Sequence, residues 1–351
     1  MTVFVRLSLS VSAFGIALAA VACGAGPEAR HLDSVQARPN VVVSPKPTKP
    51  NSAPINSAPS SPSPTNPPPS NSAPTNPPST NPEPSQPKSS VPVFNHVVLL
   101  LEENHSYSSV IGSSSMPYLN SLVSQYGLAT DYYANTHPSI GNYFMLTTGQ
   151  IITNNDAYNK TVTVDNMVRH FISGAKTWKA YAESLPSVGY TGWDVYPYVK
   201  HHNPFAYFSD VVNSSTEKDN LVPFSQFSSD LKNGQLPQFG YVLPNMLDDA
   251  HDESLKTADD WLNTNIAPLI SNSSFQKSGL LIVVFDESTT SDTQHGGGHV
   301  AMLVISPSAK KDYKSSTFYQ HQSTCRLVLQ GLGMSSFPSS CSSAPQMGEF
   351  F

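Results

Sequence analysis

The chain has 351 residues, of which 13% are charged and 38% are hydrophobic, and its formal net charge is −6. Proteins that bind nucleic acid neutralise phosphates with clustered lysine and arginine side chains, and no such cluster stands out here. The composition therefore argues against nucleic acid as a partner. The length is sufficient for one large domain together with additional segments.

The first 22 residues have the pattern of a secretory signal peptide. Arg6 is followed by an uncharged apolar run over residues 7–22, which is too short and too rich in alanine for a membrane-spanning helix. Residues 20–23 resemble a bacterial lipoprotein box, although Ala20 stands where leucine is usual. Lipidation of Cys23 and simple secretion after cleavage near Ala22 both remain open. In both cases we expect a secreted, periplasmic or cell-surface protein. A lipidated Cys23 would anchor the protein to the membrane.

Residues 23–92 are predicted to form a linker that is rich in proline, serine and asparagine. More than half of the 31 prolines lie between residues 39 and 92, where Asn-Ser-Ala-Pro recurs. Such a segment lacks the apolar side chains that would offset the entropy of ordering, so we expect it to be disordered. Residues 93–351 are then expected to form one large folded domain.

Only two cysteines follow Cys23, and both lie near the C-terminus. In an oxidising compartment Cys325 and Cys341 can form a disulfide that closes a C-terminal loop. The alternative is two unpaired, buried cysteines.

The remaining chain alternates between predicted strands and predicted helices. Continuous apolar runs predict strands that are buried on both faces, at residues 97–101, 239–243, 280–285 and 300–305. Helical patterns cover residues 116–126, 165–173, 177–184, 258–267 and 322–332. This alternation predicts an α/β fold, a three-layer sandwich with a mostly parallel central sheet. In such sheets the site lies beyond the carboxyl ends of the strands.

Acidic and amide side chains follow two of these strands. Glu103 and Asn104 come after the first run, and Asp286 and Glu287 come after the third. Oxygen ligands of this kind suit a divalent cation such as Ca or Mg, and an added imidazole widens the choice to Zn, Mn or Fe. Residues 295–299 form a glycine-rich loop that ends at His299, and its glycines would let the backbone approach a ligand closely. The alternative for each acidic strand end is a solvated loop.

The stretch around Thr136 combines a hydroxyl, an imidazole and a proline. Pro138 fixes its own φ and pushes His137 towards extended geometry, which predicts a sharp strand-to-helix turn at Thr136. A helix that begins just after the turn would direct free backbone N–H groups at an anion. Thr136 can act as a nucleophile if a metal or a base lowers its pKa, and the alternative is an ordinary helix N-cap.

Two further groups of polar residues carry histidines. His201 and His202 precede a turn at Asn203, and at least one of them is expected to contact a phosphate or a leaving group. Residues 248–252 combine three carboxylates with His251, which suits a second ligand set or an acid–base group. The alternative for residues 248–252 is a polar loop with an N-cap.

Taken in order, these motifs resemble the bacterial phosphoesterases of the alkaline phosphatase superfamily, a family that includes acid phosphatases and phospholipase C enzymes. The resemblance spans residues 94–332. Its six motifs lie at residues 103–107, 136–143, 202–205, 244–252, 285–287 and 298–307.

The resemblance implies an alkaline phosphatase-like fold and a metal-dependent hydrolase of phosphoric esters whose nucleophile is Thr136. His202 or His251 would protonate the leaving oxygen, and Asn142 and His201 would contact the substrate. The implied ligands of the divalent metal are Glu103, Asn104, Thr136, Asp286, Glu287 and His299. The chain is shorter than the long members of the family, and residues 288–292 after Glu287 lack the expected glycine-rich segment, so the number of metal ions stays open.

Three alternatives remain beside a phosphatase. One is a phospholipase C that acts on phospholipid head groups, and another is a non-catalytic cell-surface binding module on a stalk. The third is a sulfatase, which ranks low because the turn at Thr136 lacks the arginine of the Cys/Ser-x-Pro-x-Arg motif. The oligomeric state and the physiological substrate are not predicted.

Overall fold

The computed structural model describes residues 90–351. The predicted signal peptide, the lipidation site at Cys23 and most of the predicted linker lie outside the described residues. Within this described part, none of the helices combines the length and the apolar character needed to span a bilayer.

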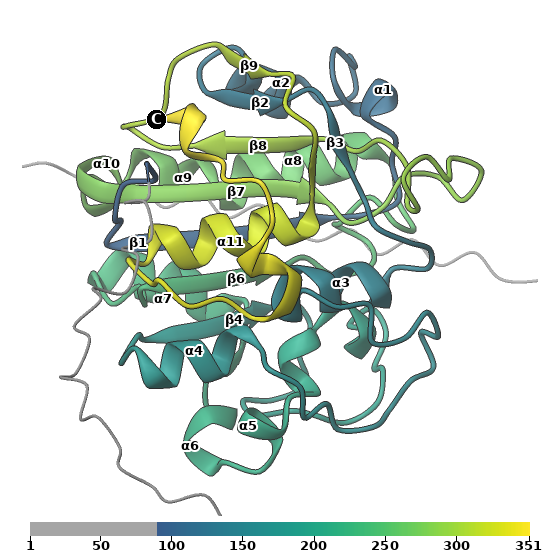
Figure 1. The fold of residues 1–351 in the computed structure, drawn as a ribbon, viewed down its shortest axis with the longest axis vertical. Helices are drawn as coiled ribbons and strands as arrows, with labels where there is room; N and C mark the ends of the chain where they lie inside the picture. Colours follow the sequence, from purple (N-terminus) through teal and green to yellow (C-terminus); the bar gives the residue numbers. More distant parts are fainter. Residues whose placement is uncertain (1–89) are drawn as a thin grey trace, which may run out of the picture. The chain divides into compact units, whose positions relative to one another are not determined.

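An eight-stranded sheet forms the centre of the fold, in the order β5-β4-β6-β1-β7-β8-β2-β9 (Figure 1). All neighbouring strands are parallel except for the two pairs that β8 makes with β7 and β2. The strands are β1 (His96–Glu102), β2 (Gly127–Ala129), β4 (Trp178–Ala182), β5 (Leu221–Pro223), β6 (Phe239–Leu243), β7 (Gly279–Phe285), β8 (Met302–Ile305) and β9 (Tyr313–Ser315). Two short strands, β3 (Tyr132–Tyr133) and β10 (Tyr319–Gln320), pair separately.

The register of the two central strands places the acidic ends side by side. β1 and β7 pair over their whole length, from His96 opposite Gly279 to Glu102 opposite Phe285. Every residue of β7 is buried, as the continuous apolar run predicts for a strand covered on both faces. Because the two strands are parallel and end in register, Glu103 and Asp286 leave the sheet next to each other.

Helices cover both faces of the sheet, which confirms the predicted three-layer α/β fold. In Figure 1, α11 (His321–Gly331) and α4 (Met167–Ser173) lie in front of the sheet, and α8 (Leu255–Asn265), α9 (Ala267–Ser271) and α10 (Ser273–Ser278) lie behind it. The remaining helices are α1 (Tyr107–Val110), α2 (Pro117–Val123), α3 (Ile140–Thr148), α5 (Ser209–Val212), α6 (Ser215–Lys218) and α7 (Ser225–Asn233). Short 3-10 segments are η1 (Lys200–His202), η2 (Pro204–Ala206), η3 (Ser339–Ser342) and η4 (Gly348–Phe350).

One predicted helix, over residues 177–184, is wrong, because this segment forms strand β4. Lys179 and Tyr181 both hydrogen-bond Asp230 of α7, at 2.6 and 2.7 Å, whereas the Trp178 ring stacks on Phe205 of η2. Side chains that alternate in this way follow the two-residue period of a strand. Pairing with β5 and β6 therefore overrides the helix propensity of the two alanines in this segment.

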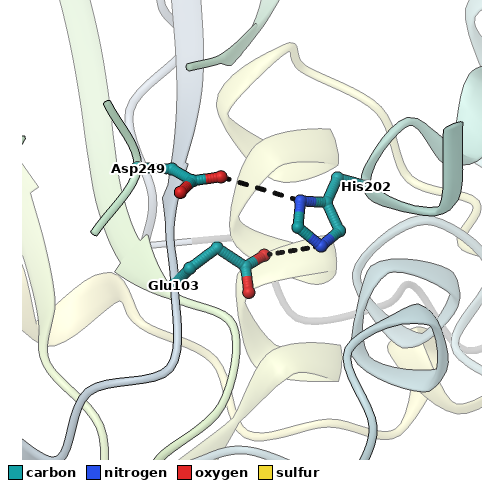
Figure 2. Close-up of side chains that lie close together, drawn as sticks. All are labelled: Glu103, His202 and Asp249. Atoms are coloured by element: carbon teal, nitrogen blue, oxygen red, sulfur yellow. Dashed lines mark ion pairs between the residues drawn. The ribbon is translucent and has the colours of Figure 1, made fainter. Parts of the chain in front are cut away.

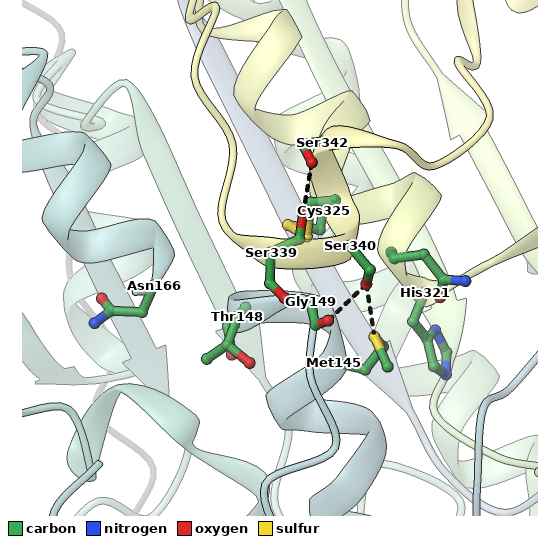
Figure 3. Close-up of a disulfide and its surroundings, with 12 residues drawn as sticks. Met145, Thr148, Gly149, Asn166, His321, Cys325, Ser339, Ser340 and Ser342 are labelled. Atoms are coloured by element: carbon green, nitrogen blue, oxygen red, sulfur yellow. Dashed lines mark hydrogen bonds between the residues drawn. A yellow bond between two sulfur atoms is a disulfide. The ribbon is translucent and has the colours of Figure 1, made fainter. Parts of the chain in front are cut away.

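A disulfide joins Cys325 of α11 to Cys341 of η3, the pair that the sequence analysis expects (Figure 3). Gly149, which ends α3 with a φ of +68°, lies directly against this bond. A Cβ atom at this glycine would come within 2.9 Å of the Cys341 sulfur. The Ser340 hydroxyl also donates a hydrogen bond to the Gly149 carbonyl at 2.6 Å. The disulfide therefore braces the C-terminal end of α3.

Candidate active site

The acidic ends of β1 and β7 meet at the carboxyl edge of the sheet. Asn104 adopts a left-handed conformation with a φ of +55°, which asparagine tolerates better than most residues. Its backbone N–H donates to Asp286 Oδ1 at 3.2 Å. The two sequence-predicted acidic strand ends are therefore held together by a direct contact.

Glu103 is completely buried and connects three elements. Its Oε2 accepts a hydrogen bond from the Ser139 hydroxyl at 3.2 Å, and its Oε1 accepts one from the Tyr143 hydroxyl of α3. The same Oε1 lies 3.4 Å from His202 Nε2 of η1. Glu103 thus links strand β1 to helix α3 and to the histidine pair.

Glu103, His202 and Asp249 form a buried group that fits a metal ion (Figure 2). One ligand atom from each residue lies within 4.8 Å of the others, and Asp249 Oδ2 is 3.7 Å from His202 Nδ1. Among residues 90–351, His202 Nε2, Asp249 Oδ2 and the neighbouring Asp286 Oδ2 have no hydrogen-bond partner. Buried polar atoms without partners are costly, and a cation would satisfy them. Imidazole and carboxylate ligands together suit Zn, Mn or Fe.

The pKa shifts within this cluster also favour a bound cation. Burial raises the pKa of Glu103 well above its usual range, and the charges of Asp286 and Asp249 raise it further. Burial also raises the pKa of Asp286 to about 6 and, with the charge of Asp286, the pKa of Glu287 to about 9. Burial lowers the pKa of His202 far below its usual range, so this imidazole is neutral. A cation would relieve the repulsion among the carboxylates.

Thr136 lies on the turn between β3 and α3, as the sequence predicts, and is 8% exposed. Its hydroxyl donates to the His137 carbonyl at 3.2 Å and accepts a hydrogen bond from Asn154 Nδ2 at 2.8 Å. The N-cap residue of α3 is Ser139, so the alternative reading of Thr136 as an N-cap is wrong.

The backbone N–H groups at the start of α3 are not free, contrary to the prediction. The N–H of Ile140 donates to Asp156 Oδ1 at 3.2 Å, and the N–H of Asn142 donates to the Ser139 carbonyl at 2.9 Å. A carboxylate of the protein therefore occupies the position at which the sequence analysis expects an anion.

Asn142 is fully buried and uses its whole side-chain amide within the protein. Its Oδ1 accepts from the backbone N–H groups of Asn135 and Thr136, at 2.9 and 3.2 Å. Its Nδ2 donates to the Thr136 carbonyl at 2.8 Å and to Glu287 Oε2 at 3.2 Å. An amide has two donors and two acceptor lone pairs, so no capacity is left for a ligand. The geometry makes Asn142 a positioning residue rather than the expected substrate contact.

The glycine-rich loop packs against the same turn. A Cβ atom at Gly296, whose φ is +111°, would lie 2.0 Å from the Asn135 carbonyl oxygen, and one at Gly297 would lie 2.4 Å from the Thr136 carbonyl oxygen. Only glycine permits such a close approach. His137 completes this contact, with Nδ1 3.0 Å from Glu287 Oε1 and Nε2 2.9 Å from the Asp292 carbonyl.

His299 is not brought to the acidic group, contrary to the expected ligand role. Its Nε2 hydrogen-bonds the Thr130 carbonyl at 3.1 Å, and its ring stacks on Tyr107 and Tyr133 at centroid distances of 4.3 and 4.8 Å. Within residues 90–351, the only set of three or more acidic, histidine or cysteine ligands that converge within 4.8 Å is Glu103, His202 and Asp249.

His201 and His251 flank the buried His202 on its solvent side. The His251 ring lies 6.1 Å from the His202 ring, and its Nδ1 is 2.7 Å from Asp252 Oδ1. The side chain of His251 is 31% exposed, whereas that of His202 is 1% exposed. The His201 ring is 4.5 Å from the His202 ring, and burial lowers the pKa of His201. His251 can therefore exchange protons with solvent, whereas His202 is enclosed between two carboxylates.

The sequence indicated residues 248–252 as a second ligand set without distinguishing Asp249 from its neighbours, and it gave no indication of Asn154. Asp249 lies in the acidic run 248–252, where its complete burial is not visible from composition. Asn154, which contacts the Thr136 hydroxyl, has no local pattern that could have indicated it.

The fold is similar to that of solved structures that include a member of the alkaline phosphatase superfamily. An alkaline phosphatase superfamily protein from Vibrio parahaemolyticus superposes with a TM-score of 0.53 at 14% identity, covering 71% of this chain and 69% of that protein. The lipoteichoic acid synthase LtaP from Listeria monocytogenes gives 0.51 at 11% identity, covering 73% and 76%. At these identities the likeness concerns the fold alone.

The sequence model of the phosphoesterase family matches residues 113–335, and the chain belongs to this family. A phosphatidylinositol-3-phosphatase from Mycobacterium tuberculosis is 33% identical over 217 residues, which cover 60% of this chain and 71% of that protein. A probable acid phosphatase from Kluyveromyces lactis is 30% identical over 66% of this chain, and an acid phosphatase from Aspergillus fumigatus is 31% identical over 69%. The chain spans 56% of the length of each of these two acid phosphatases.

Proposed function

We propose that the protein is a metal-dependent, acid phosphatase-like hydrolase of phosphoric esters with Thr136 as its nucleophile. One observation carries the proposal. Asn142 hydrogen-bonds both the turn that bears the Thr136 hydroxyl and Glu287, whose neighbour Asp286 has a buried oxygen without a hydrogen-bond partner. The similarity to acid phosphatases and to a phosphatidylinositol-3-phosphatase supports the same chemistry.

Two sets of residues would hold divalent cations. The first set comprises Glu103, Asn104, Thr136, Asp286 and Glu287, which follow β1 and β7 or lie on the nucleophile turn. The second set is Glu103, His202 and Asp249, and it assigns His202 to metal binding instead of proton transfer. When bound, a cation supplies charge that stabilises the phosphoryl oxygens and lowers the pKa of the Thr136 hydroxyl.

In the proposed reaction, Thr136 attacks the phosphate ester and His251 transfers the protons. Thr136 Oγ, having lost its proton to solvent, attacks phosphorus in line with the ester oxygen. The phosphorus–oxygen bond of the ester breaks, and His251 gives a proton to the departing alkoxide. Water next attacks the phosphothreonine while His251 takes back a proton, which releases phosphate and restores Thr136. Asp252, 2.7 Å from His251 Nδ1, orients this imidazole. His201, beside His202, would contact the phosphoryl group.

The decisive test is a pair of valine substitutions assayed on a soluble phosphate monoester with metal-restored protein. Thr136→Val keeps the shape and β-branching of the side chain, and turnover should fall about 1,000-fold or more because the attacking oxygen is lost. Thr136→Ser should keep part of the activity. The control, Thr163→Val, makes the same change at an exposed threonine and should be close to wild type. A folded Thr136→Val protein with near-normal turnover would exclude Thr136 as the nucleophile. Absence of hydrolysis by the metal-restored, unmutated protein would instead favour a binding module.

We also propose that residues 1–22 are a signal peptide, 23–92 a linker and 93–351 the catalytic domain of a secreted or Cys23-anchored protein. The composition of the first 92 residues supports this division. A chain that starts at Pro92 should keep its specific activity on a soluble ester, and a folded but inactive product would contradict the assignment.

The acid phosphatase and phosphatidylinositol-3-phosphatase relatives favour a phosphomonoester over the phospholipase C alternative, which needs a diester.

A further inference from the structure

Exposed apolar side chains are concentrated in one segment. Of the eight exposed large hydrophobic residues among residues 90–351, four lie within nine positions: Val188, Trp193, Val195 and Tyr196. Trp193 and Tyr196 are the most exposed aromatic residues of this set, at 60% and 62%. Single exposed apolar residues are ordinary, but a cluster marks a surface that something covers. We call residues 188–198 the rim segment.

The rim segment holds these side chains outward by its own contacts. Val195 and Tyr198 exchange two backbone hydrogen bonds of 3.0 Å, and the Tyr190 hydroxyl donates to the Trp193 carbonyl at 2.8 Å. A Cβ atom at Gly192 would collide with the Tyr190 ring at 2.5 Å, so glycine lets the chain pass close to that ring. The buried ring of Tyr198 meets Tyr190 edge-on at 6.1 Å. The backbone conformation is therefore fixed with Trp193, Val195 and Tyr196 in solvent.

The rim segment also borders the mouth of the candidate active site. The Tyr196 hydroxyl donates to Asp252 Oδ2 at 3.1 Å, and the other oxygen of Asp252 contacts His251. Asp194 accepts from the Lys200 backbone N–H at 2.7 Å and lies 3.7 Å from His201 Nδ1. The rim segment therefore lies directly beside His201 and His251, the two histidines on the exposed side of the candidate active site.

We propose that the rim segment docks the active site onto a lipid surface, where Trp193, Val195 and Tyr196 enter the interfacial region and the ester is carried by a lipid. Tryptophan and tyrosine favour this region because one end of the ring is apolar and the other is polar. Asp194 and Asp252 lie beside the segment, and Lys218 packs against Gly189 within it, so neither sign of charge prevails and apolar burial drives docking. The phosphatidylinositol-3-phosphatase relative is consistent with a lipid-borne ester. The catalytic part of this inference rests on the proposed function, but the docking part does not.

Tryptophan fluorescence can report docking directly. The chain has three tryptophans, and Trp178 and Trp261 are buried at 3% and 7% exposure, so a change of emission on vesicle binding reports Trp193. The test uses the full chain with Cys23→Ser, which removes the possible lipid anchor, and vesicles of phosphatidylcholine. We expect a blue shift, quenching by lipids that carry a quencher in the upper acyl chain, and little dependence on salt.

A matched pair of double variants isolates the rim segment. Trp193→Ser with Val195→Ser should lower vesicle partitioning about tenfold or more, measured by co-sedimentation. Val93→Ser with Ile172→Ser removes two exposed apolar side chains elsewhere and should bind vesicles as the wild type does. The ratio of turnover on vesicle-borne phosphatidylinositol phosphate to turnover on a soluble ester should fall for the first pair alone. If the first pair fails to fold, quenching of Trp193 in the otherwise unchanged chain decides the question.

The outcomes separate docking from catalysis. Hydrolysis of soluble esters without an emission shift on vesicles would overturn the docking proposal and leave the proposed function standing. A shift that Thr136→Val retains, together with no hydrolysis of any ester by the unmutated protein, would support docking and reject the proposed function. A shift that grows with protein concentration in the absence of vesicles, together with a larger particle mass, would identify a self-association surface and overturn the proposal. Binding that needs anionic lipid and disappears in salt would also overturn it.

Discussion

Replacing Asn142 by alanine should damage both the stability and the activity of the protein. The substitution removes the four hydrogen bonds that connect helix α3 to the Thr136 turn and to Glu287. A buried donor left without a partner costs about 1–3 kcal/mol. With the backbone N–H groups of Asn135 and Thr136 both unpaired, the free energy of unfolding should fall by about 2–6 kcal/mol. Turnover should fall as well, because the turn that presents the Thr136 hydroxyl is no longer held.

The matched comparison is Asn154→Ala, which removes one hydrogen bond from an exposed side chain to the Thr136 hydroxyl. We expect its free energy of unfolding to stay within about 0.5 kcal/mol of wild type. Its turnover should nevertheless fall about tenfold, because the orientation of the hydroxyl is released. Urea unfolding gives the stabilities, and steady-state kinetics on a soluble phosphate ester gives the activities at a temperature where both variants are folded. An Asn142→Ala protein with wild-type stability, or with wild-type kcat while folded, would refute the reasoning.

Two further predictions concern the acidic group. Folding raises the pKa of Asp286 to about 6 and that of Glu287 to about 9. Between pH about 4 and these values, the folded metal-free protein therefore binds more protons than the unfolded chain. The free energy of unfolding should consequently fall as the pH rises through this window. In the presence of a chelator, the melting temperature should be higher at pH 5 than at pH 8. A divalent cation should raise the melting temperature more at pH 8 than at pH 5. A higher melting temperature at pH 8 in chelator would show that groups of the protein itself balance the carboxylate charges. Asp249→Asn should weaken metal binding about tenfold or more in calorimetric titrations, whereas Asp248→Asn, which changes an acid outside the buried group, should not; equal affinities would remove Asp249 from the site.

The sequence predicted the central strands well because they are long and continuously apolar. The runs that became β1, β6 and β7 are buried on both faces, and this burial is directly visible as an unbroken hydrophobic pattern. Strands β2, β3, β5, β9 and β10 have only two or three residues each, which is too short for any periodicity. The direction of β8 is likewise set by its partners in the sheet, and no local pattern separates a parallel strand from an antiparallel one.

Within the candidate site, residues that follow long strands were predictable and residues that act through contacts were not. Glu103 and Asp286 stand at the ends of apolar runs, so their position at one edge follows from a parallel sheet. Asp249 differs from its acidic neighbours only in burial, which depends on tertiary packing. His202 was assigned to proton transfer because its type allows it, but its burial between two carboxylates favours a ligand. The positioning role of Asn142 depends on four partners that no linear pattern displays.

The reversed strand β8 has a consequence for how this architecture can diversify. Because β8 runs antiparallel to β7, the connection over residues 286–301 leaves the sheet and re-enters it at the same edge, above the acidic group. Lengthening such a connection costs little, about 0.6 kcal/mol for each doubling of its length, and shifts no strand register. An insertion at the exposed residues 289–291 would therefore change the surface beside the nucleophile turn, whereas Asp292, Gly296 and Gly297 must keep their contacts with that turn. The antiparallel direction of β8 therefore provides a connection whose length can vary among related proteins while the strands of the sheet keep their register.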